Sequence, residues 1–162
     1  MTDNPTKLLV LGIGNPNCGD DAAGPDVVKR IEKVDTANIQ ARAIPGEAAS
    51  IIAAMKGYNQ VVLVDAILPA NPTGALHVFD VSRSPLPVGL FGHFSTHSIG
   101  LAEAVELARA LGELPPRVIA LGIEGERFEP GDPMSPRVKE AVKEAARWIL
   151  QRSDSYSLIE RE

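Results

Sequence analysis

One stretch of the chain decides the fold class: Gln60–Ile67, with the sequence QVVLVDAI. Its apolar side chains are continuous rather than alternating, which is typical of a strand in a sheet covered on both faces. Similar short apolar runs occur at Lys7–Ile13 (KLLVLGI) and at Arg117–Ile123 (RVIALGI). We therefore predict three buried strands at these places.

Segments with helical spacing separate the predicted strands. Helices are expected near residues 21–34, 48–56, 98–111 and 136–151, and further strands near 37–44 and 76–81, the second at a sheet edge. Strands that alternate with helices indicate an α/β fold. We predict a single three-layer domain over residues 1–152, with a mainly parallel twisted sheet of about five strands and helices on both faces, a phosphorylase/hydrolase-like fold. Residues 153–162 are expected to form a polar tail.

The composition narrows the classes of function. The chain has 162 residues, one cysteine (Cys18) and a formal net charge of −5, from 16 Lys and Arg against 21 Asp and Glu. A single cysteine excludes an internal disulfide framework and a cysteine-rich zinc finger. The negative charge argues against nucleic acid and anionic membranes as partners. With no signal-like N-terminus, we expect a cytoplasmic protein, and we expect a monomer.

The loop after the first strand carries an unusual set of residues. Gly12–Asn17 begins like a dinucleotide-binding fingerprint, but Asn17 stands where the third glycine would fall, and Pro16 lacks a backbone donor. The loop continues with Gly19-Asp20-Asp21 and Gly24. Two carboxylates at the start of a helix interact favourably with the helix dipole, and the simpler interpretation is that Asp20 caps the helix. Capping needs only one acid, so the presence of Asp21 beside it favours a further role.

Asp65 closes the apolar run that defines the third strand. A carboxylate next to a buried strand must be solvated, paired or bound to a cation, so a cap or a loop hydrogen bond is the alternative to a functional role. If the strand order is 2-1-3, the first and third strands are neighbours at the point where ligands bind in such sheets. Asp21 and Asp65 would then lie close together.

A histidine could complete a ligand set with these acids. His97 directly precedes a predicted helix, and His93 lies four residues earlier in the same loop. Two carboxylates and an imidazole suit zinc, nickel or iron. Taken alone, His97 is equally compatible with a surface or capping role. His77 is expected to face solvent, and the acidic segment of Glu124, Glu126, Glu129 and Asp132 is expected to be a solvated loop.

Taken together, these motifs resemble a known family. Gly12-x-Gly14-Asn15 with Gly19-Asp20-Asp21-x-x-Gly24, then Val61–Ala66, then Thr96-His97, is similar to the nickel-iron hydrogenase maturation proteases. The segments Leu121–Ile123 and Pro133–Ser135 also fit. The resemblance extends from about Leu8 to Ile149. No single motif is decisive, but the ordered set is specific.

The resemblance implies a fold, an activity and a site. The fold is a twisted sheet of about five strands between helices. The activity is removal of a short C-terminal extension from the precursor of the hydrogenase large subunit. Asp21, Asp65 and His97 would bind nickel, which arrives with the precursor rather than being held permanently, and Asp21 and Asp65 would be catalytic. Gly14, Asn15 and Asp20 are expected to bind the substrate.

Several alternatives stay open at this stage. Ile44–Glu47 differs from the Asp-Gly-Gly type of loop in many members, which leaves the particular hydrogenase undefined. A carboxylate could act as general base, or Asp21 and Asp65 could share a proton as in aspartic proteases. A nickel-dependent assembly chaperone would need the same ligands. Peptidyl-tRNA hydrolase also begins with a strand and Gly-x-Gly-Asn-Pro, but the Thr-Arg-His-Asn type of segment expected after it is missing.

Overall fold

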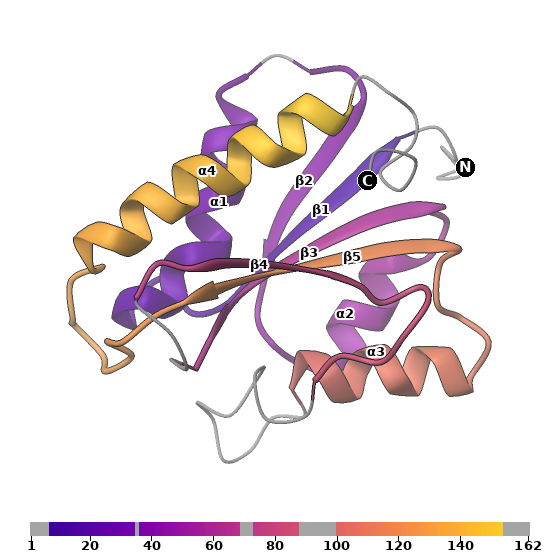
Figure 1. The fold of residues 1–162 in the computed structure, drawn as a ribbon. Coiled ribbons are helices and arrows are strands. Elements are labelled where there is room, and N and C mark those ends of the chain that lie inside the picture. The colour runs from indigo at the N-terminus through magenta and orange to yellow at the C-terminus, as the bar shows by residue number, and fades with distance from the viewer. Residues whose placement is uncertain (1–6, 35, 69–72, 88–99, 154–162) are drawn as a thin grey trace.

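The computed structural model describes residues 7–34, 36–68, 73–87 and 100–153 (Figure 1). Strands and helices alternate along the chain, as the sequence predicts. The elements are β1 (Leu8–Ile13), the 3-10 helix η1 (Gly19–Ala22), α1 (Ala23–Glu32), β2 (Ile39–Ile44), α2 (Ala48–Met55), β3 (Gln60–Ile67), β4 (Leu76–Asp80), α3 (Leu101–Ala110), β5 (Arg117–Glu124) and α4 (Pro136–Ser153).

The strands form one sheet of five with the order β2-β1-β3-β5-β4. Four strands are parallel, and β4 pairs antiparallel with β5 at one edge. This confirms the prediction of a mainly parallel sheet in which the first and third strands are neighbours. The chain reverses its winding direction between β1 and β3, so the crevice beyond their carboxyl ends is where an open α/β sheet binds ligands.

Helices cover both faces of the sheet (Figure 1). The helices α1 and α4 pack on one face, and α2 and α3 pack on the other, so the sheet divides two separate hydrophobic cores. The central strands β1, β3 and β5 are buried at almost every residue, because both faces are covered. None of the described helices is both long and apolar enough to cross a membrane.

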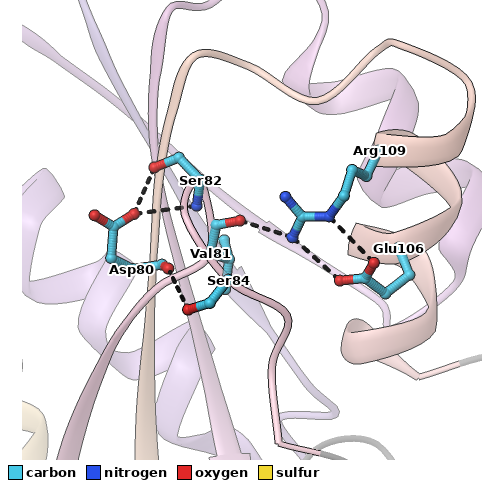
Figure 2. A network of polar contacts seen from close by, with 6 residues as sticks. All are labelled: Asp80, Val81, Ser82, Ser84, Glu106 and Arg109. Carbon is cyan, nitrogen blue, oxygen red and sulfur yellow. Dashed lines mark hydrogen bonds and ion pairs between the residues drawn. The ribbon is translucent and has the colours of Figure 1, made fainter.

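A polar network fixes α3 against the end of the sheet (Figure 2). The guanidinium of Arg109 donates to the Glu106 carboxylate at 3.1 Å and to the Val81 carbonyl at 2.8 Å. The hydroxyl of Ser82 accepts the Val118 N–H at 3.2 Å, which ties the same turn to β5. These contacts hold the C-terminal half of α3, and the first turn of this helix lies at the candidate site described below.

Glu124 and His77 depart from what the sequence predicts for them, whereas Glu126 and Glu129 of the acidic segment are exposed as expected. Glu124 belongs to the strand rather than to a solvated loop, and only 1% of its surface is exposed. His77 does not simply face solvent, because its Nε2 lies 2.9 Å from Glu124 Oε1. The antiparallel register pairs His77 with Gly122, which places the ring beside the end of β5. A sequence pattern cannot show this register, so the pairing was missed.

Candidate active site

A hollow of about 570 Å³ opens at the carboxyl ends of β1, β2 and β3. Its walls come from the loop after β1, the β2–α2 connection, the end of β3 and the first residues of α3. Asp21 and Asp65 both line it, together with Gly14 and Asn15. The topology therefore brings together the two acids that the sequence analysis singled out, with two of the three residues expected to bind substrate.

Close backbone packing sets the position of Asp21. A Cβ atom on Gly24 would lie 2.6 Å from the Val64 carbonyl oxygen, and a Cβ on Gly12 would overlap the carbonyl of Gly24. Only glycine lets the start of α1 sit this close to β1 and β3. The preceding turn, which carries Asp21, is thereby held over the ends of these strands.

The carboxylate of Asp21 organises the loop after β1. Its Oδ2 accepts the backbone N–H of Asn15 at 2.8 Å, and Asn15 Oδ1 accepts the N–H of Asn17 at 2.9 Å. Burial raises the pKa of Asp21, and the hydrogen bond from Asn15 opposes that shift. The site therefore weakens the tendency of this carboxyl to ionise, because water solvates it incompletely.

Asp65 is the more deeply buried acid, with 4% of its surface exposed. It follows Val64, where the pairing of β3 with β1 ends, so its side chain stands at the switch point of the sheet. Burial raises the pKa of Asp65 well above its ordinary value, and the negative charge of Asp21 raises it further. A backbone hydrogen bond at Ala66 acts in the opposite direction. A proton or a cation would relieve the repulsion between the two carboxylates.

The donor set fits a divalent cation in part. Carboxylate oxygens suit a borderline divalent ion when an imidazole completes the set. Among the residues that the structure describes, no group of three or more His, Cys, Asp and Glu side chains could hold a metal ion. His97, the expected third ligand, and its alternative His93 lie outside the described residues. The structure thus brings together two of the three expected ligands.

Asp20 lies next to Asp21 in sequence but is used differently. It is completely buried, and its carboxylate accepts the backbone N–H groups of Glu126 (2.8 Å), Arg127 (3.0 Å) and Ser135 (2.7 Å), as well as the Ser135 hydroxyl (2.8 Å). No side-chain capping bond is present at the start of η1. Asp20 therefore offers a substrate no surface, and its geometry is that of a positioning residue rather than the substrate-binding residue expected.

The residues that hold Asp20 were not found from the sequence. The carboxylate of Glu126 accepts hydroxyl hydrogen bonds from Thr73 at 3.0 Å and from Ser135 at 3.3 Å, so it joins the β3–β4 and β5–α4 connections. Ser135 directly precedes α4, which begins at Pro136, and its hydroxyl is directed at Asp20. In the sequence, the segment Pro133–Ser135 was noted only as part of the family resemblance. Nothing in this segment indicates that Asp20 is its partner.

The fold and this site define the class of protein. A hydrogenase maturation protease model, HycI, matches residues 45–152, and the chain belongs to this family. The fold is that of the hydrogenase-maturating endopeptidase HybD from Escherichia coli, with a TM-score of 0.74 at 23% identity over 92% of this chain and 94% of that one.

Curated relatives support the same assignment. The chain is 26% identical to the hydrogenase 2 maturation protease of Escherichia coli, over 89% of this chain and 88% of the relative. It is 27% identical to a putative hydrogenase maturation protease of Methanocaldococcus jannaschii, over 88% of this chain and 94% of the relative. The protein is a hydrogenase maturation endopeptidase, which cleaves the C-terminus of a hydrogenase large subunit.

Proposed function

We propose that this endopeptidase cleaves the large-subunit precursor of a nickel-iron hydrogenase only after nickel has been inserted. Asp21 and Asp65, together with His97, contact the nickel of the precursor, and the same two carboxylates take part in cleavage. The observation that carries this proposal is the pair of carboxylates in one hollow, where burial and the charge of Asp21 both raise the pKa of Asp65. The metal is part of the substrate, not a resident cofactor.

Electrostatics explains how such a site could test for nickel. Without a cation, an incoming peptide meets two acids whose negative charges repel each other and are poorly solvated. A divalent cation on the precursor removes that repulsion, so binding of the loaded precursor is favoured over binding of the empty one. Specificity then depends on correct assembly of the substrate, since only the loaded form completes the site.

The two acids also supply the groups that peptide hydrolysis needs. Water attacks the scissile carbonyl carbon, the C–N bond breaks, and a proton passes from the water to the leaving amine. Asp21 or Asp65 can accept that proton as a carboxylate base. In the variant mechanism the two share one proton, which the raised pKa of Asp65 would permit. Both mechanisms require the two acids to remain in the same hollow.

The test is the intact mass of a large-subunit precursor before and after incubation with the protein. We expect loss of a C-terminal peptide from the nickel-loaded precursor and no change in the nickel-free precursor. The nickel-free sample is the matched control, because it carries the same scissile bond. The precursor is taken from the nickel-iron hydrogenase produced in the same cells, where we propose that the protein acts in the cytoplasm.

Two outcomes would contradict the proposal in different ways. Cleavage of both precursors at equal rates would show that nickel is not tested. Stable binding of the loaded precursor with no mass loss would favour an assembly chaperone, which needs the same ligands but breaks no bond.

A further inference from the structure

The strand β2 differs from the other parallel strands in its exposure. Every residue of β1 is buried, whereas every residue of β2 is half-buried or exposed. It stands at one end of the strand order, and no strand within the described part of the chain pairs with its outer side. An edge of this kind presents backbone N–H and C=O groups that can pair with another chain.

The hydrogen bonds to β1 show which residues of β2 face outward. The N–H of Leu8 donates to the Asn38 carbonyl at 2.9 Å, and the N–H of Gly14 donates to the Ile44 carbonyl at 3.4 Å. The even-numbered residues therefore direct their backbone groups at β1. Because alternate residues of a strand bond to opposite neighbours, the odd-numbered residues of β2 direct theirs outward.

Two separate hollows lie beside β2, one toward each end of the strand. The hollow that holds Asp21 and Asp65 reaches Ala43 and the β2–α2 connection. A second hollow, of about 430 Å³, lies beside residues 39–41 and against the end of α1. The hollow at the carboxyl end of β2, which reaches Ala43, is the candidate active site itself.

The occupant that fits is the polypeptide being cleaved. An endopeptidase must hold its substrate chain extended through the site, and an extended chain has its own unpaired N–H and C=O groups. We propose that the precursor, on one side of its scissile bond, adds to β2 as a sixth strand and pairs with the outward groups of Ala41 and Ala43. This proposal rests on the proposed function, because it takes Asp21 and Asp65 as the point of cleavage.

The start of the added strand is marked by Pro45. Proline has no N–H and ends a ladder, so pairing along this edge begins at Ala43, beside the active-site hollow. The opposite edge of the sheet, β4, contributes no described residue to that hollow. Val78 on β4 is 47% exposed, and its register places it among the outward-facing residues of that strand. It provides a matched control position.

The first test replaces the outward N–H of Ala43 by proline. For the Ala43→Pro variant we expect KM for the nickel-loaded precursor to rise roughly two- to tenfold, the change that loss of a hydrogen bond brings, with kcat within twofold. Val78→Pro makes the same change on the other edge and should leave KM unchanged. An unchanged KM in Ala43→Pro would overturn the proposal.

The second test needs no variant and so does not depend on tolerance of proline. Hydrogen exchange is pulse-labelled during turnover with excess nickel-loaded precursor, and the amides of Ala41 and Ala43 should exchange at least severalfold more slowly than in the free protein. The amide of Val78 should not change. If Ala41 and Ala43 are already protected in the free protein and lose protection on dilution, a second copy occupies the edge and the proposal is wrong.

The two proposals fail separately. If the unaltered protein does not cut the nickel-loaded precursor, the proposed function fails, whatever the exchange rates show. If cleavage is normal but neither test responds at β2, only the added strand is rejected.

Discussion

Two buried aspartates in this protein are treated in opposite ways. Asp20 is fully enclosed and accepts four hydrogen bonds from the β5–α4 connection. Asp65 is nearly as buried, yet loss of water and the negative charge of Asp21 raise its pKa by more than the hydrogen bond at Ala66 lowers it. The comparison teaches that burial alone does not mark a functional acid. What matters is whether the fold itself satisfies the charge.

The largest expected effect is the loss of cleavage when the incompletely satisfied pair is broken. Asp21→Asn or Asp65→Asn removes a carboxylate that we propose contacts nickel and serves the hydrolysis, so we expect the cleavage rate to fall by about 10³-fold or more. His97→Ala should have a similar effect. The measurement is loss of the C-terminal peptide by mass spectrometry. Circular dichroism should show a folded protein, and retained processing by the Asp21 and His97 variants would reject the site.

Replacing Asp20 should act on stability instead. Asp20→Ala leaves the N–H groups of Glu126, Arg127 and Ser135 without their acceptor, and we expect the free energy of unfolding to fall by about 3–5 kcal/mol. Urea denaturation measures the change. Glu129→Ala, a change of an exposed acid in the same connection, is the control and should cost about 0.5 kcal/mol or less. Equal midpoints for the two variants would mean that Asp20 does not anchor this connection.

The next largest effect concerns the close approach of the start of α1 to strands β1 and β3 at Gly24. A Cβ on Gly24 meets the backbone of Ile13 and Val64, which cannot move aside easily. Gly24→Ala should therefore destabilise the protein by about 2–3 kcal/mol and also displace Asp21, which would lower activity. Gly46→Ala is the control, since a Cβ there makes only an ordinary contact of 3.6 Å with Ile13. Thermal melts of the two variants separate a specific close approach from a general intolerance of alanine.

The smallest expected effect is a gain in stability rather than a loss. The pKa of Asp65 is higher in the folded protein than its ordinary value of 3.8, so the folded state binds more protons than the unfolded state above that pH. Ionisation of Asp65 therefore destabilises the fold as pH rises through this interval. Asp65→Asn should raise Tm at pH 7, by roughly 2–4 °C for each kcal/mol relieved.

The pH dependence provides the control for this prediction. The gain in Tm should shrink as pH is lowered toward 4, where Asp65 of the parent protein is protonated and the two proteins become alike. A lower Tm for Asp65→Asn at pH 7 would show that the fold, and not a ligand, uses this carboxylate. Asp65 would then be a structural acid like Asp20, whose charge the fold itself satisfies.

Much of the fold could be predicted from the sequence, because local patterns of apolar residues determine its strands and helices. Continuous apolar runs such as Gln60–Ile67 define buried strands, and the expected neighbourhood of the first and third strands was enough to bring Asp21 and Asp65 together. The pairing of His77 with Glu124 was not readable, because it depends on the register of an antiparallel edge. The direction of an edge strand leaves no clear trace in the residues of that strand.

The role of Asp20 was out of reach for a different reason. Its partners lie 106, 107 and 115 residues further along the chain, and three of the four donor groups are backbone N–H groups, which every residue except proline carries. The side chains at positions 126 and 127 therefore do not predict these hydrogen bonds. Two adjacent acids looked equivalent in the sequence, and only the long-range packing distinguishes them.

The place of β5 in the sheet governs when the protein can become active during synthesis. Since β5 lies between β3 and β4, the last-made strand must enter between two strands made earlier. The donors to Asp20 are made later still, up to Ser135. A nascent chain that has only reached α3 has β4 without its partner and the turn carrying Asp21 without its anchor. Synthesis through Ser135 is thus needed before the turn that carries Asp21 is anchored, so a shorter nascent protease has no assembled site with which to cut.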